Sequence, residues 1–278
     1  MSGWHPHLEV WALVIAAGVA YVVALRRVGP RHVSPGDAPA SGGQKTAFFL
    51  GLGAVWAASD WPVHELSEQA LFSVHMFQHL LLSLVAPPLL LMGIPGWMAR
   101  ALLPRPIMAV ARRVTRPLLA LILFNAVLVV THWPVLVDAS LRSEAVHFSV
   151  HAVLFVSALI MWTPVLSPIA ELPRLHYPGQ MLYLFLQSLL PTVPASFLTF
   201  GDSVIYRFYE TVPRTLGLSA LHDQQIAGIV MKLGGGFILW AAILVLFFKW
   251  HAQEEMPGVD ALRWQDVERE INREEVHR

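Results

Sequence analysis

Apolar residues along this chain are gathered into long runs that polar segments, glycines and prolines separate. Seven runs reach about 18 residues or more, the length an α-helix needs to cross the hydrocarbon core of a bilayer. The pattern therefore predicts an all-α fold, a polytopic membrane helix bundle with seven transmembrane helices. The predicted spans cover residues 8–26, 45–62, 70–92, 116–133, 144–166, 178–201 and 221–249.

The composition agrees with a membrane location. Hydrophobic residues make up 55% of the chain and charged residues only 14%, whereas soluble domains carry about 25% charged residues. The formal net charge is zero, so nothing indicates a nucleic-acid partner, and the lipid bilayer is the expected surroundings. The first apolar run lacks a basic leading segment and a small-residue cleavage site, so we expect it to be retained as a span.

Basic residues are divided unequally between the two sets of connecting segments. Fifteen lie on one side of the predicted spans and three on the other, while Lys232 falls inside the last span. Because Lys and Arg accumulate in cytoplasmic loops, the N-terminus is predicted outside and the C-terminus in the cytoplasm. Residues 1–250 then form the membrane domain and 251–278 a charged cytoplasmic tail. The basic segment 97–116 is predicted either as a short helix on the membrane surface or as an ordinary loop.

Two histidine pairs interrupt the third and fifth apolar runs. His75 and His79, like His147 and His151, are four residues apart, which places both rings of a pair on one helix face. At about 1.5 Å per residue, both pairs lie in the outer half of the bilayer. Ionisable rings are costly in hydrocarbon, and imidazole binds copper, zinc, iron and nickel. The pattern predicts a metal site near the outer face.

Other candidate ligands are expected at the same level. The chain has no cysteine, which excludes thiolate ligation and covalent haem attachment. Each further candidate also has a structural explanation, such as interfacial anchoring beside Trp133 or helix capping after Ser219. These candidates are His132 at the end of the fourth span, His222 and Asp223 at the start of the seventh, Asp60 beside the second, and Met76 as a soft ligand for Cu(I).

The histidines also admit other interpretations. They suit structural polar packing between helices, a proton or quinone path, or ligation of a haem b by one histidine from each pair. An intramembrane zinc hydrolase is disfavoured, because the residue before His79 is Gln78, which cannot act as a general base. No other catalytic set is visible, so the chain is not expected to be an enzyme.

A series of motifs closely resembles the CtaG family of cytochrome c oxidase assembly factors. The most specific block reads SVHMFQHLLL over 73–82 and APPLLLMGIP over 86–95. His132-Trp133-Pro134, His147 and His151, PVLSP at 164–168, GLS at 217–219 and DQQIAG at 223–228 follow in order. The likeness covers about residues 45–250.

The resemblance implies a multi-pass protein of a bacterial cell membrane that assists assembly of cytochrome c oxidase, with oxidase subunits as its partners. It further implies delivery of copper to an oxidase centre, although a purely scaffolding role stays open. Haem b remains the alternative cofactor.

Overall fold

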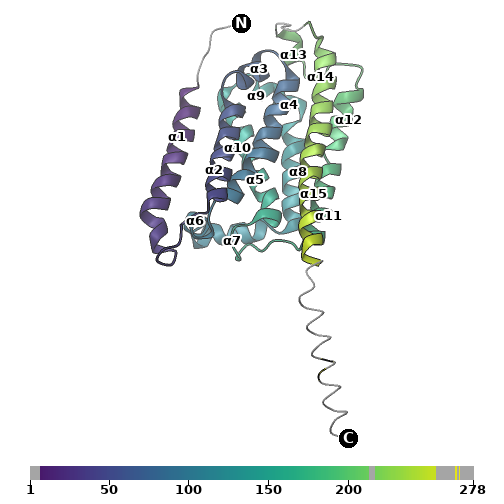
Figure 1. The fold of residues 1–278 in the computed structure, drawn as a ribbon. Helices are drawn as coiled ribbons and strands as arrows, with labels where there is room; N and C mark the ends of the chain where they lie inside the picture. The colour runs from purple at the N-terminus through teal and green to yellow at the C-terminus, as the bar shows by residue number, and fades with distance from the viewer. Residues whose placement is uncertain (1–6, 213–216, 255–266, 268, 270–278) are drawn as a thin grey trace.

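The computed structural model of this chain describes residues 7–212, 217–254, 267 and 269. Within these residues every regular element is helical and no β-strand occurs, which confirms the all-α prediction. Figure 1 shows the long helices side by side in one bundle, with α1 at its edge and short helices at both ends. The predicted tail 251–278 lies almost wholly outside the described residues.

Seven helical units run along the described bundle, and their bounds lie within a few residues of most predicted spans. They are α1 (Leu8–Val23) with the π-helical turn η1 (Ala24–Val28) and the 3-10 turn η2 (Gly29–Arg31); α2 (Gly42–Ser59); α4 (Phe72–Leu80) with the π-helical turn η3 (Leu81–Val85) and α5 (Ala86–Gly93); α8 (Pro117–Thr131); α10 (Glu144–Leu166); α11 (Tyr177–Leu189) with α12 (Thr192–Phe200); and α14 (Ala220–Ile229) with the π-helical turn η4 (Val230–Gly234) and α15 (Gly235–Glu254).

Short helices cover both ends of this bundle (Figure 1). One end carries α3 (Val63–Gln69), α9 (Pro134–Ser140) and α13 (Phe208–Thr211). We call it the outer end, because the distribution of basic residues predicts that it faces outside. The opposite end carries α6 (Gly96–Leu102) and α7 (Arg105–Val114). The segment 97–116 is therefore helical, in two pieces that meet at Pro104.

Five helices in the described part of the chain are long and apolar enough to cross a membrane, spanning 8–31, 72–93, 144–166, 177–200 and 220–254. The count becomes six if α7 and α8, which meet at an angle of 84°, form one bent span. By itself α8 has only 15 residues, and α2 begins with a polar turn that contains Gln44 and Lys45. Five predicted spans are thus confirmed, while spans at α2 and α8 and the orientation stay predictions.

Prolines shape the helical unit that carries the first histidine pair. A proline has no N–H and its ring clashes with the carbonyl four residues earlier. Pro87 and Pro88 therefore leave the carbonyls of Ser83 and Leu84 without their usual donors, and the chain forms η3 at this point. The indole Nε1 of Trp162 donates a hydrogen bond to the Ser83 carbonyl at 3.1 Å. This bond fixes α10, which carries the second pair, against the first.

Candidate metal centre

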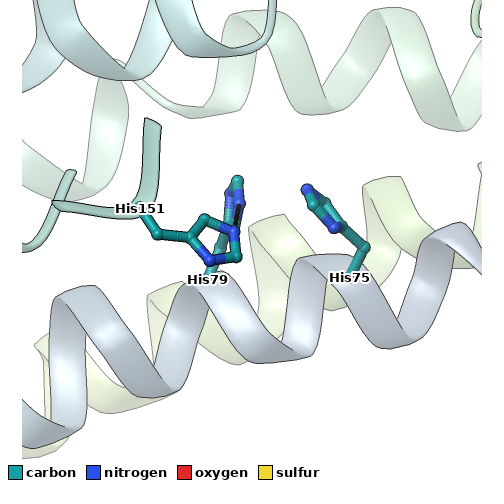
Figure 2. A group of neighbouring side chains, drawn as sticks. All are labelled: His75, His79 and His151. Carbon is teal, nitrogen blue, oxygen red and sulfur yellow. Dashed lines mark hydrogen bonds between the residues drawn. The ribbon is translucent and has the colours of Figure 1, made fainter. Parts of the chain in front are cut away.

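The two predicted histidine pairs come together inside the bundle. His75 and His79 lie on α4, and His151 approaches them from α10 (Figure 2). The possible ligand atoms of these three residues lie within 4.8 Å of one another. Nε2 of His79 is 3.1 Å from Nε2 of His151. His75 and His79 are only 3% and 6% exposed, so the group is enclosed by the protein.

Two more imidazoles border this group. The ring of His147 lies 4.2 Å from that of His151 and 5.9 Å from that of His75, between ring centroids. The ring of His132, at the end of α8, lies 5.3 Å from that of His79. Nδ1 of His132 donates a hydrogen bond to the Leu128 carbonyl at 2.7 Å, which leaves Nε2 as the basic nitrogen. The four histidines of the two pairs therefore lie close together in the bundle, and His132 lies beside them.

The nitrogen atoms at this centre suit a metal ion. Nδ1 of His75 and Nδ1 of His79 are buried and have no hydrogen-bond partner among the described residues. Such atoms lower the stability of the fold, because burial removes their hydrogen bonds to water and no protein group replaces them. Two nitrogens bound at about 2.0–2.1 Å to one ion lie up to about 4 Å apart. Because the three histidines already hold their donors within 4.8 Å, small ring rotations suffice to bind an ion.

Asp223 holds in place the helix that carries His75 and His79. Its carboxylate accepts hydrogen bonds from the backbone N–H of Phe72 at 2.6 Å, from the N–H of Ser73 at 3.1 Å and from the Ser73 hydroxyl at 2.6 Å. These N–H groups belong to the first turn of α4, where a negative charge also complements the helix dipole. Asp223, which is fully buried, thus caps α4 from α14, and the structure does not bring it into the histidine group.

Gln78, between the two histidines of the α4 pair, connects them to the outer end. Its side-chain nitrogen donates to the Ala58 carbonyl at 2.8 Å and contacts Nδ1 of His64 at 3.2 Å. Its oxygen accepts a hydrogen bond from the Ser67 hydroxyl at 3.0 Å. From the sequence alone, Gln78 serves only to disfavour a hydrolase. Its burial within the α4 pattern is the only signal that could have indicated one.

A row of rings leads from the outer end to the centre. The ring of His64 on α3 lies 5.4 Å from that of His147 and 4.5 Å from that of His7. Burial lowers the pKa of His64 to about 4, so this ring is neutral at physiological pH and can accept the hydrogen bond from Gln78. The sequence places His64 beside Asp60 at the outer end of the second predicted span, and His7 in the N-terminal segment as a first contact for a metal ion. It favours an ordinary solvated role for both, because they stand in short polar segments without helical periodicity.

The remaining predicted ligands lie beside the centre or away from it. Asp60 is buried and accepts hydrogen bonds from the backbone of His7 at 3.0 Å and from the Trp11 indole at 2.8 Å, which joins α1 to the end of α2. His222 is exposed, and its backbone N–H is capped by Ser219. Met76 is buried in the apolar core next to His79. Asp60 and His222 are not part of the grouped ligand atoms.

The geometry does not support the haem alternative. A haem with two axial histidines must fit its macrocycle between their rings, yet His79 and His151 are in hydrogen-bond contact. The cavity that adjoins His79 measures about 50 Å³, far below the roughly 300–1,000 Å³ of pockets for drug-sized ligands.

Comparison with known proteins identifies the family. A family model described as "Cytochrome c oxidase caa3 assembly factor (Caa3_CtaG)" matches residues 19–253. The chain belongs to this family. The CtaG match confirms the resemblance drawn from the motifs and includes every histidine of the centre.

Two mycobacterial proteins are also similar to this CtaG chain. They are "Uncharacterized protein Mb0105" of Mycobacterium bovis and "Uncharacterized protein MT0111" of Mycobacterium tuberculosis, each 29% identical over 290 aligned residues. The alignment covers 89% of this chain but only 40% of each relative, so the chain spans less than half the length of these curated relatives. No solved structure gives a significant match.

Proposed function

We propose that this CtaG protein is a non-enzymatic assembly factor that binds copper in the membrane and delivers it to a cytochrome c oxidase subunit. His75, His79 and His151 are the ligands, with His147 as a fourth nitrogen donor. The observation that carries the proposal is the convergence of three ligand-bearing imidazoles within 4.8 Å in a member of an oxidase assembly family.

The donor set is suitable for copper that must later be released. Neutral imidazoles bind copper well, and without cysteine the chain offers no thiolate that would hold Cu(I) more tightly. His151 is only half-buried, unlike His75 and His79, so one ligand can exchange with a partner. The row from His147 through His64 to His7 supplies further imidazoles between the centre and the outer end.

A purely scaffolding role explains less of the structure. Histidines that only join helices would be expected to bond helix carbonyls or hydroxyls through their buried nitrogens, as Nδ1 of His132 does with the Leu128 carbonyl. His75 and His79 instead keep a buried Nδ1 without such a partner.

Copper retention by purified protein tests the binding step. Wild type, His79→Ala, His151→Ala and His222→Ala are loaded with Cu(I) in detergent without oxygen, freed of excess metal, and analysed for copper per protein. We expect wild type and His222→Ala, whose ring is exposed and outside the centre, to retain copper equally. The affinity of His79→Ala and His151→Ala for copper should fall by at least about tenfold. Loss of an outer-shell partner alone lowers metal affinity by about 10–100-fold, and loss of a direct ligand should lower it at least as much. Equal copper in all four proteins contradicts the proposal.

Delivery is tested in cells that lack the endogenous protein. Cells supplied with wild type or His222→Ala should assemble an oxidase with full copper content, whereas His79→Ala should leave the oxidase polypeptide present but depleted of copper. An oxidase that is fully loaded in the His79→Ala cells contradicts delivery, even if the purified protein binds copper.

A further inference from the structure

A cavity lies on the inner side of the histidine centre. It measures about 50 Å³, and one ordered water needs about 10–15 Å³ by this measure. His79 and His132 line it, and so does Lys232 of η4. The space is therefore continuous with the proposed copper ligands and has room for an ion.

Three methionines from three helical segments line the same cavity. Met76 belongs to α4, Met161 to α10 and Met231 to η4. They are 2%, 0% and 7% exposed, respectively. The chain has nine methionines in all, so a third of them border this one space.

We propose that Met76, Met161 and Met231, together with His79, form a second copper site in this cavity that is specific for Cu(I). Thioether sulfur is a soft ligand that selects Cu(I), whereas imidazole accepts several metals. The proposal rests on the proposed function of the histidine centre as a copper site, and it adds a deeper position to which the ion can move.

Ordinary packing does not account for this arrangement. Methionine commonly fills irregular gaps in a core because its side chain is flexible. Here three such flexible side chains leave a cavity between them, and its wall also includes the exposed Lys232.

His79 connects the two sites. Its Nε2 faces His151 at 3.1 Å, while its buried Nδ1 has no hydrogen-bond partner among the described residues, and the side chain also borders the cavity. When the ion moves, copper–nitrogen bonds to His75 or His151 break and copper–sulfur bonds form. The ion remains Cu(I), and because every ligand is neutral no proton or electron is transferred.

X-ray absorption at the copper K-edge tests this site. Because the chain has no cysteine, any sulfur scatterer around copper must be a methionine. Wild type and the triple variant M76L/M161L/M231L are compared after loading with Cu(I), with M98L/M181L as the control, since Met98 and Met181 do not line the cavity. Leucine is close to methionine in volume, so the core should remain filled.

We expect sulfur and nitrogen scattering in wild type and in the control, and nitrogen alone in the triple variant. Copper with only nitrogen ligands in wild type overturns the methionine site and leaves the histidine site standing. A wild type that takes up no copper overturns both. If the triple variant does not fold, Met161→Leu and Met231→Leu are measured singly, and each should lower the sulfur coordination number; no change in either overturns the proposal.

Discussion

Around the centre, single residues act either as nitrogen donors or as supports for those donors. His75, His79 and His151 contribute the grouped ligand atoms, while Asp223 and Gln78 contact backbone or neighbouring side chains and not the group itself. This division matters because a support can be replaced without changing the atoms that surround a bound ion, whereas a ligand cannot.

Replacing Asp223 with Asn separates these two roles. Asparagine keeps the shape but removes the negative charge at the start of α4 and turns one acceptor oxygen into a donor. We expect the free energy of unfolding in detergent to fall by about 2 kcal/mol, from a weakened cap and an unsatisfied buried N–H. Thermal unfolding measures this change. Asp202→Asn, an exposed carboxylate near the same end, is the control and should be neutral.

The copper content of the folded Asp223→Asn protein completes that test. A capping residue lowers stability and leaves the nitrogen ligands of copper unchanged in X-ray absorption. Loss of copper at unchanged stability would show instead that Asp223 is a ligand.

Spacing along one helix was enough to predict the pairs His75–His79 and His147–His151, because residues four apart share a face whatever the tertiary structure. The role of Asp223 could not be predicted in this way, since its partners Phe72 and Ser73 lie about 150 residues away in the chain. Because Asp223 lies in the first turn of α14, just after Ser219, the sequence suggested that it caps α14. Only the tertiary packing shows that it caps α4.

At the scale of elements, hydropathy predicts the bounds of the long helices closely, but it does not predict the π-helical turns within them. The run predicted at 144–166 is α10 with those bounds, because length and apolar content decide what crosses a bilayer. The π-helical turns η3 and η4 carry no hydropathy signal. They follow from prolines and from packing between helices, and both border the cavity beneath His79. Such turns often occur at functional sites.

Close contact between α2 and α5 depends on glycine. A Cβ atom added at Gly93 would lie 2.5 Å from the backbone nitrogen of Phe48, whereas at Gly53 it would meet nothing within 4 Å. We expect Gly93→Ala to lower the free energy of unfolding by about 1–3 kcal/mol through overpacking. Gly53→Ala should be neutral or stabilising by up to about 1 kcal/mol, since alanine favours the helix. Thermal unfolding of both variants checks this. Equal stability would contradict a tight α2–α5 contact.

At the scale of the whole molecule, the centre and the basic residues are near opposite ends of the bundle. The short helix α3 brings His64 to the outer end, while α6 and α7 cover the other end (Figure 1). Arginines 105, 112 and 113 on α7 are exposed alongside Ile107 and Val110, a mixture typical of helices that lie on anionic membrane surfaces. The 84° bend between α7 and α8 fits a helix of this kind better than one long span.

The predicted orientation follows from this arrangement and can be measured directly. Because the chain has no cysteine, any introduced cysteine is its only thiol. Ser203 near the outer end and Ser34 in the first connecting segment of the opposite side are both exposed. In intact cells we expect a membrane-impermeant maleimide to label Ser203→Cys but not Ser34→Cys, and to label both after permeabilisation. The reverse pattern would place the histidine centre toward the cytoplasm, where an assembly factor could not receive copper from outside. If both Ser34→Cys and Ser203→Cys were labelled in intact cells, the two positions would lie on the same side of the membrane. The predicted five spans between them would then be wrong.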